Sequence, residues 1–454
     1  MGQAPFYKMK QRQWLGIIVA AGVWLGSFGL RAEVLGTCPT ATGTGWLERS
    51  EQGDLILHLQ GSYHDMGVEH AKLLGPDTGL ALRSAKNSIH HEVPFLPASL
   101  SVRLIYQFFG KKQAAFIPPQ FLEEMKGLAE AGGVPMNTIV ALHAMTYLTS
   151  CAGAAAWGPA TRDGRLYFLR SNDLGILVDP VTHTVYHDRG MIVIYQPVGE
   201  IPYLMVSWPG FIGASEGMNA EGIAVGNMSD PSREETPAGL PMPFRIKQTL
   251  GQAHNLDEAI AWMSKPPLEG GYNFLVADAK IPKAVAMEMD AKTVYVGGWD
   301  GAAESNHYSY QGREYVYEAK AGLLVRTNHP LSAELIARHE KKIDDGRAHS
   351  KWSAERYQDL KARLVQQYGS LDLETMNQIL RDHYQSVQWE TGPTWGATSH
   401  QLVLDPRSGD LLIAFSRGNP LEQGRRQVSA FSQPYHRYNF YELLHKLPQE
   451  EGGP

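Results

Sequence analysis

The spacing of apolar residues predicts helices in the first third of the chain. One strand-like run, Leu55–Leu59, precedes Ser62, whose hydroxyl can cap the helix that follows it. Two further apolar helices are predicted, one opened by Pro119 and one from Pro135 to Tyr147. Residues 33–150 are therefore expected to form a strand followed mostly by helix.

The pattern becomes rich in strands after residue 150. Runs of β-branched and aromatic residues predict strands at Met191–Val198, Tyr203–Trp208 and Tyr272–Asp278. Two amphipathic helices, Ser353–Tyr368 and Leu373–His383, lie between later strands. Strands in bulk with helices between them predict an α+β fold, in which helical layers cover β-sheets.

The junction between the two parts predicts a hairpin. Small residues follow Cys151, a tight turn is indicated at Asp163-Gly164, and the second strand alternates up to Asp173. Antiparallel pairing would bring the Cys151 thiol beside the ends of Arg170 and Asp173, so that a thiol, a guanidinium and a carboxylate converge. An unperturbed thiol has a pKa of about 8.5, which a neighbouring cation lowers. The alternative is that Cys151 is a small buried hydrophobic residue.

The motifs of this hairpin resemble those of a known family. They are Cys151, Trp157-Gly158, Ala160-Thr161, Asp163-Gly164 and Arg170-x-x-Asp173. They are similar to the start of the mature chain in the acyl-coenzyme A:6-aminopenicillanate acyltransferase family, which is related to the choloylglycine and penicillin V hydrolases. All of these are N-terminal-nucleophile hydrolases. The resemblance implies a four-layer αββα sandwich.

An N-terminal nucleophile would supply the base that the sequence lacks near Cys151. His143 lies eight residues before the cysteine, and His183 lies beyond the hairpin. Cleavage of the Ser150–Cys151 bond would create an α-amine with a pKa of about 7.7–8.0, which can accept the thiol proton. The expected products are a helical pro-region or α chain of 118 residues (33–150) and a catalytic β chain of 304 residues (151–454). The cleaved α segment is a predicted partner of the β chain.

The resemblance also assigns roles to residues beyond the nucleophile. Arg170 would favour the thiolate, and Asp173 would orient the α-amine. Asn273 is the main choice for a donor to the developing oxyanion, and Asn227 is the weaker choice. Arg356, in Ser-Ala-Glu-Arg-Tyr, matches a family arginine near the site.

Two positions depart from the family pattern. Ala152 follows the nucleophile where many relatives have Ser or Thr, and Leu174 follows the motif aspartate where many have an aromatic residue. Both positions are expected to line the acyl pocket. The sequence therefore leaves open the acyl group, the amine, and the choice between hydrolysis and acyl transfer.

The N-terminus has the features of a secretory signal peptide. Basic residues precede an apolar run from Trp14 to Leu30, and Ala32 offers a small residue for cleavage. Export to the periplasm or the medium is expected, with an uncleaved membrane anchor as the alternative. Removal of residues 1–32, which hold four basic and no acidic residues, would change the formal net charge from −6 to −10.

Composition excludes several classes of partner. The acidic balance and the lack of a basic stripe argue against nucleic acid. No His, Cys or carboxylate spacing is typical of a metal site, so neither a metal nor another cofactor is predicted. Cys38 and Cys151 are the two cysteines, too few for a disulfide framework, and a bridge between them would disable the nucleophile. The oligomeric state stays open.

Three functions are consistent with these features. The first is an exported, autoprocessed cysteine amidohydrolase or acyltransferase that cleaves a linear, non-peptide C–N amide of a small N-acyl substrate through an acyl-thioester on Cys151. The second is a papain-like Cys–His hydrolase using His329, although the papain signature around the cysteine is missing. The third is a non-enzymatic exported binding module.

Overall fold

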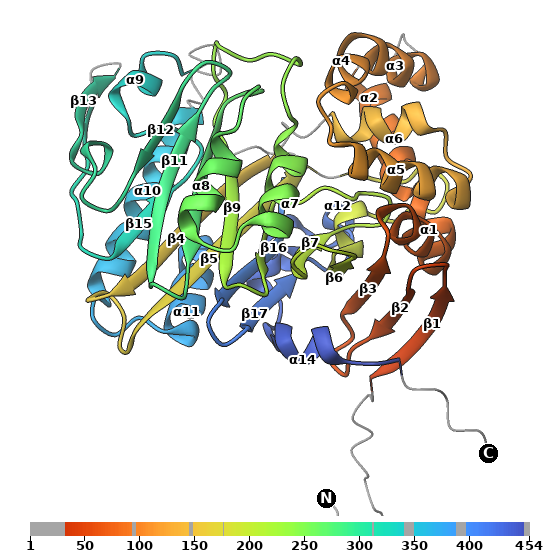
Figure 1. Ribbon diagram of the computed structural model, residues 1–454. Coiled ribbons are helices and arrows are strands. Elements are labelled where there is room, and N and C mark those ends of the chain that lie inside the picture. The colour runs from red at the N-terminus through yellow and green to blue at the C-terminus, as the bar shows by residue number, and fades with distance from the viewer. Residues whose placement is uncertain are drawn as a thin grey trace, which may run out of the picture.

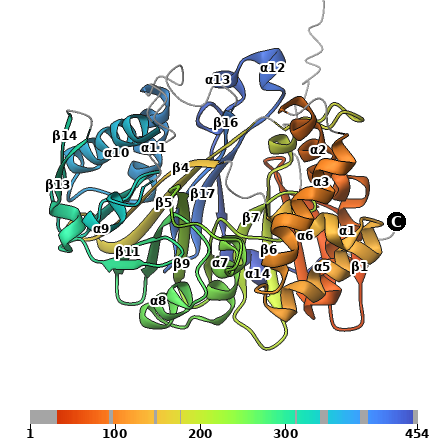
Figure 2. The ribbon, with the colours of Figure 1, turned by 90° about the horizontal axis from the view of Figure 1, so that it is seen from above.

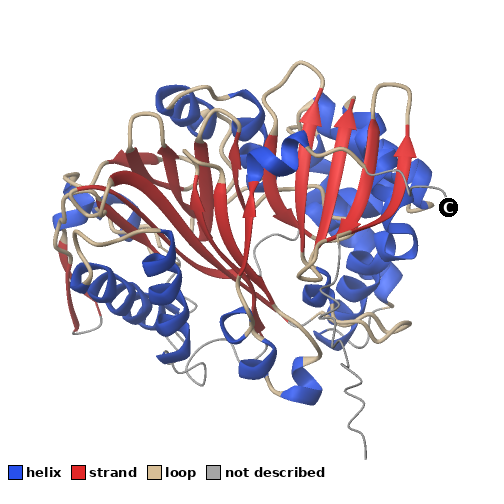
Figure 3. Ribbon diagram, turned by 90° about the horizontal axis from the view of Figure 1, so that it is seen from below, coloured by secondary structure: helices blue, strands red, loops and turns tan. Residues whose placement is uncertain are grey.

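A computed structural model describes residues 32–92, 97–144, 149–175, 177–310, 313–339, 349–386 and 396–448. Two β-sheets lie face to face, and helices cover the outer face of each (Figures 1 and 3). Residues 1–31 of the predicted signal peptide (1–32) and part of the helix expected at 135–147 lie outside the described residues.

The larger sheet has ten strands in the order β1-β2-β3-β6-β7-β8-β9-β10-β11-β12. They are β1 (Glu33–Pro39), β2 (Thr44–Arg49), β3 (Leu55–Gly61), β6 (Met191–Pro197), β7 (Tyr203–Ser207), β8 (Glu216–Asn219), β9 (Ile223–Ser229), β10 (Tyr272–Asp278), β11 (Lys283–Met289) and β12 (Val294–Gly297). Neighbours are antiparallel except for β3 and β6, which pair in parallel from Leu55–Met191 to Gly61–Pro197.

The smaller sheet has six antiparallel strands in the order β15-β4-β5-β16-β17-β18. They are β15 (Leu323–Arg326), β4 (Thr149–Gly158), β5 (Gly164–Gly175), β16 (Gly396–Asp405), β17 (Asp410–Phe415) and β18 (His436–Asn439). A separate pair joins β13 (His307–Tyr310) to β14 (Arg313–Val316).

Fourteen α-helical segments lie within the described residues. They are α1 (Tyr63–Leu74), α2 (Leu80–Glu92), α3 (Ala98–Ile105), α4 (Lys111–Ala114), α5 (Pro119–Gly132), α6 (Met136–His143), α7 (Met242–Gln252), α8 (Leu256–Ser264), α9 (Ala333–Ile336), α10 (His349–Gln366), α11 (Leu373–Ser386), α12 (Pro420–Gln423), α13 (Arg425–Val428) and α14 (Phe440–His445). As predicted, Ser62 caps α1 by accepting a hydrogen bond from the Asp65 N–H, 3.2 Å away.

Three apolar cores define four layers, which confirms the αββα sandwich. One core joins α1, α5, α7 and α8 to the ten-stranded sheet, and a second joins α10 and α11 to the six-stranded sheet. The third lies between the two sheets. Figure 2 shows the two helical layers on opposite sides of the sheets.

The small residues of β4 allow the two sheets to approach closely at the site. A Cβ placed on Gly153 would lie 3.1 Å from the sulfur of Met228 in β9 and 3.4 Å from Leu275 in β10. Cys151 and Ala155 belong to the core between the sheets, whereas alternate residues of β4 face the layer of α10 and α11. Alternation along β4 thus directs Cys151 towards the other sheet.

The expectation of a mainly helical segment at 33–150 is wrong in one respect. This segment also supplies β1, β2 and β3, three strands of the ten-stranded sheet, so residues 151–454 do not form the sandwich alone. β1 (EVLGTCP) and β2 (TGWLER) mix apolar positions with Gly and charged residues, so neither sequence has the run of β-branched and aromatic residues that identified the later strands. Residues 33–150 are therefore an integral part of the fold.

Candidate active site

The Cys151 side chain is completely buried between the two sheets, in the first half of β4. The predicted hairpin is confirmed, since β4 and β5 pair with Cys151 opposite Asn172 and Ser150 opposite Asp173. Neither Cys151 nor Cys38 forms a disulfide. The thiol therefore lies beside β5 within a dry, packed interface.

Arg170 reaches the thiol directly, as the hairpin predicted. Its Nη2 lies 3.1 Å from Cys151 Sγ and 3.2 Å from Asn227 Oδ1, and its Nε donates to the Asn227 carbonyl at 2.9 Å. Nη1 forms an ion pair with Glu216 of β8. A fully buried guanidinium is stable only when it is paired in this way, so the interaction with the sulfur is geometrically fixed.

Glu216 balances the charge of Arg170 and connects it to a histidine. Its Oε1 lies 2.7 Å from Nε2 of His400 in β16. Burial by itself would raise the pKa of Glu216, but Arg170 and His400 outweigh burial and the net shift is downward. Glu216 is therefore an anion that pairs with Nη1 of Arg170, while Nη2 contacts the thiol.

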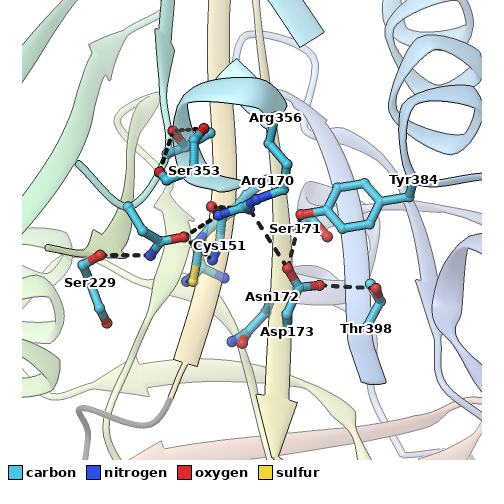
Figure 4. Close-up of polar contacts among 12 residues, drawn as sticks. Cys151, Arg170, Ser171, Asn172, Asp173, Ser229, Ser353, Arg356, Tyr384 and Thr398 are labelled. Carbon is cyan, nitrogen blue, oxygen red and sulfur yellow. Dashed lines mark hydrogen bonds and ion pairs between the residues drawn. The ribbon is translucent and has the colours of Figure 1, made fainter. Parts of the chain in front are cut away.

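The peptide groups on both sides of the Cys151 Cα are held by two further residues (Figure 4). The Cys151 N–H donates to Asn328 Oδ1 at 2.9 Å, and Arg356 Nη1 donates to the Cys151 carbonyl at 2.8 Å. Arg356 Nη2 also donates to Asn328 Oδ1, and the guanidinium stacks on the Trp352 ring at 3.7 Å. Arg356, predicted only by resemblance, thus contacts the main chain of Cys151.

Asp173 lies on the other face of the hairpin, so the expectation that its carboxylate converges with the thiol and the guanidinium is wrong. Residues three apart on a strand point to opposite faces, and Asp173 faces the layer of α10 and α11 while Arg170 faces β9. Asp173 accepts hydrogen bonds from Tyr384 at 3.0 Å and Thr398 at 2.9 Å. Its link to Cys151 runs through Arg356, whose Nη1 is 3.9 Å from Asp173 Oδ2.

Burial raises the pKa of Asp173 to about 6, although Arg356 and the two hydroxyl donors oppose this shift. Asp173 therefore ionises near pH 6, where the folded protein can be titrated.

The structure reverses the order of preference between the two predicted oxyanion donors, Asn273 and Asn227. Asn273 Nδ2 donates to the carbonyls of Thr327 and His329, both at 2.8 Å, so both of its N–H groups are used to hold the loop that carries Asn328. Asn227 uses Oδ1 to accept from Arg170, and its buried Nδ2 has no hydrogen-bond partner among the described residues. Asn227 is therefore the better candidate donor, and Asn273 is a positioning residue.

His329 belongs to a hydroxyl cluster on the helical side of the small sheet. Its Nε2 is 2.9 Å from the Tyr317 hydroxyl, and its Nδ1 is 2.7 Å from Ser353 Oγ. The Cys151 thiol instead lies between the sheets beside Arg170. This placement does not favour a papain-like Cys–His pair.

Sequence reasoning missed Asn328 and Glu216. Asn328 lies next to His329 in the sequence, and it accepts a hydrogen bond from the Cys151 N–H and donates to the Ser229 carbonyl at 2.6 Å. Glu216 stands in a Ser-Glu-Gly-Met-Asn run, which has no run of β-branched or aromatic residues to indicate a strand. An ionisable residue at the start of a wholly buried strand was the available signal.

Over the described ranges, no group of three or more His, Cys, Asp or Glu side chains is arranged to hold a metal ion. Within those same ranges no helix has both the length and the apolar character of a membrane span.

Comparison with known proteins gives one family match. The family described as acyl-coenzyme A:6-aminopenicillanic acid acyl-transferase matches residues 161–420. This range contains Arg170, Asp173, Asn227, Asn273 and Arg356, and it starts ten residues after Cys151.

Two curated relatives match parts of this chain, and each of them is longer than the matched region. An uncharacterized protein of Archaeoglobus fulgidus is 23% identical over 373 residues, which are 74% of this chain and 59% of that protein. Protein dcd1B of Dictyostelium discoideum is 26% identical over 227 residues, which are 45% of this chain and 44% of that protein. The chain thus spans less than two thirds of either relative.

Solved structures resemble the chain only distantly. A Caenorhabditis elegans ortholog of N-acylethanolamine-hydrolyzing acid amidase has a TM-score of 0.37 and 16% identity, covering 63% of this chain and 99% of its own. A conjugated bile acid hydrolase variant from Clostridium perfringens has a TM-score of 0.39 and 13% identity, covering 64% and 93%.

The raised pKa of Asp173 predicts a pH-dependent stability difference. A carboxyl group whose pKa is raised to about 6 stabilises the fold below its unfolded value of about 3.9, and this contribution is lost as the pH rises through 6. In an uncleavable Cys151→Ala background, Asp173→Asn should therefore raise the free energy of unfolding more at pH 7.5 than at pH 4.5, by on the order of 2 kcal/mol. Denaturant unfolding at both pH values measures this difference. An effect of Asp173→Asn that is the same at the two pH values would contradict the assignment.

Proposed function

Because the chain belongs to the acyl-coenzyme A:6-aminopenicillanic acid acyl-transferase family, we propose that it is an exported, autoprocessed cysteine amidohydrolase or acyltransferase. Its substrate is a linear, non-peptide N-acyl amide, and Cys151 carries the acyl group. The observation that carries the proposal is the 3.1 Å contact between Arg170 Nη2 and Cys151 Sγ, in a nucleophile whose own N–H and carbonyl are fixed. A cysteine with a merely structural role needs neither a guanidinium at its sulfur nor side chains that hold its N–H and carbonyl.

In the first reaction, Cys151 Sγ attacks the carbonyl carbon of Ser150. The Ser150–Cys151 C–N bond breaks as a thioester forms, and the proton lost by sulfur goes to the departing nitrogen. Water then hydrolyses the thioester, which leaves a carboxylate on Ser150 and both a thiol and an α-amine on Cys151. Asn328 and Arg356 hold the peptide groups around this bond in place while it is exchanged.

In the second reaction, the α-amine takes the thiol proton and the thiolate attacks the amide carbonyl of the substrate. Arg170 stabilises the thiolate, and Asn227 Nδ2 donates to the oxyanion of the tetrahedral intermediate. The α-ammonium returns the proton to the leaving amine as the C–N bond breaks. Water or an amine then takes the acyl group from sulfur.

Residues 33–150 remain bound after cleavage and form one subunit of the mature enzyme. The parallel pairing of β3 with β6 continues the larger sheet across the two segments. A buried ion pair also joins them, since Lys247 of α7 lies 2.5 Å from Glu124 of α5 and both side chains are inaccessible to solvent. Separating the segments would expose this pair and the core around α1 and α5.

Export follows from the N-terminal pattern, with cleavage near Ala32. N-terminal sequencing of the protein purified from its native host should find a chain that begins close to residue 33. Recovery of a chain that still starts at Met1 would contradict export with cleavage near Ala32.

Substitutions of Cys151 test the catalytic assignment. On a panel of N-acyl amides and N-acyl amino acids, Cys151→Ala and Cys151→Ser should each lower kcat/KM by at least about 10³-fold, because alanine has no nucleophile and a hydroxyl is much weaker without a strong base. Rapid quenching of the wild-type enzyme during turnover should show a mass increase equal to one acyl group.

The matched control is Cys38→Ser, which removes the other cysteine and should keep full activity. Turnover that survives in Cys151→Ala would show that another residue is the nucleophile.

A further inference from the structure

We propose that Asn172 is a specificity-determining residue whose side-chain oxygen accepts a hydrogen bond from the amide N–H of the substrate. The inference rests on the proposed function and narrows it, because it restricts the preferred substrates to amides that carry an N–H, which are primary and secondary amides. Tertiary amides and esters have no N–H to offer.

The strand register places Asn172 next to the nucleophile. Cys151 of β4 pairs with Asn172 of β5, which pairs in turn with His400 of β16. Directly paired residues on neighbouring antiparallel strands point to the same face of the sheet, with Cβ atoms about 4.5–5.5 Å apart. Figure 4 shows the Asn172 side chain beside Cys151, close to the point where β4 begins.

The Asn172 carboxamide has an unused acceptor. The residue is 1% exposed, and its Oδ1 has no hydrogen-bond partner among the described residues. Buried carbonyl oxygens are nearly always hydrogen-bonded, so one without a partner beside a nucleophile indicates a missing ligand group.

The neighbours of Asn172 already use their donors elsewhere. His400 directs Nε2 to Glu216, and Arg170 directs its nitrogens to Glu216, Asn227 and the thiol. Ser399 donates to the main-chain carbonyl of Asn172, at 3.0 Å, and not to its side chain. These side chains therefore leave Oδ1 to be satisfied by a molecule from outside the protein.

Asn172 and Asn227 together complement one functional group. Asn227 Nδ2 is a buried donor with no described partner, and Asn172 Oδ1 is a buried acceptor of the same kind. Asn227 shares the Arg170 Nη2 atom with the thiol, so both asparagines are close to the sulfur. A secondary amide presents one carbonyl acceptor and one N–H donor, which is the complement of this pair.

Asn172 takes no part in proton transfer. The substrate N–H remains on nitrogen while the α-ammonium of Cys151 protonates the nitrogen lone pair and the C–N bond breaks. Its role is to bind and orient the amide, so it should affect the choice of substrate without affecting the reactivity of the thiol.

Asn172→Leu tests this role, because leucine keeps the approximate volume and removes the acceptor. The substrates are a secondary N-acyl amide and an oxygen ester with the same acyl group. For the variant, kcat/KM should fall by about 10- to 100-fold on the amide and by less than about threefold on the ester, because only the amide loses a hydrogen bond. The alkylation rate of Cys151 should match that of the wild type.

Ser171→Ala is the matched control, since Ser171 is adjacent in β5 but pairs with Ala152 and points to the opposite face. It should leave the amide-to-ester ratio unchanged. Equal losses on amide and ester in Asn172→Leu would overturn the inference and leave the proposed function standing. A processed wild-type enzyme that cleaves no amide would overturn the proposed function, and the inference with it.

A second measurement does not depend on whether Asn172→Leu folds. The wild-type enzyme should prefer a primary or secondary amide over its N-methylated tertiary analogue, and Asn172→Ala, which leaves space for the methyl group, should reduce that preference. Equal turnover of secondary and tertiary amides by the wild type would also overturn the inference.

Discussion

The site depends on the burial of one cation. Arg170 lies in the dry interface between the sheets, where an unpaired guanidinium would destabilise the fold severely, so its nitrogens must be satisfied. Glu216 pairs with Nη1 of Arg170, and the Asn227 carbonyl accepts a hydrogen bond from its Nε. Its Nη2 contacts the sulfur of Cys151. Because Glu216 and Asn227 come from the larger sheet while Cys151 and Arg170 come from the smaller one, this network forms only when both sheets have packed. Folding therefore creates the contact between Arg170 and the thiol on which the proposed activation of Cys151 depends.

The same packing explains why the segment before Cys151 is structural. Its strands β1–β3 complete the larger sheet, and its helices supply much of the apolar core on that sheet's outer face. The Ser150–Cys151 bond thus lies at the start of a strand that is already fixed on both sides by β5 and β15. Cleavage at this bond would change the chemistry of one residue without removing any layer of the fold.

Local patterns predicted the local parts of the site. The hairpin and the Cys151–Arg170 contact depend on alternation and a turn within about twenty residues, and both could be predicted from the sequence. The same alternation places Asp173 on the opposite face of the strand. The prediction that its carboxylate converges with the thiol and the guanidinium did not take this alternation into account. Asn328 and Glu216 come from a loop and a strand far along the chain. Only the packing of the two sheets brings them to Cys151, so no spacing in the sequence could reveal them.

The central claim is that Cys151 becomes an N-terminal nucleophile. Intact-mass analysis of the purified, active protein under denaturing conditions tests it most directly. The account predicts two chains of 118 and 304 residues, the longer one beginning with an unblocked Cys151. A fully active enzyme whose chain is continuous through Ser150–Cys151 would contradict it, because the thiol would then have no α-amine as its base.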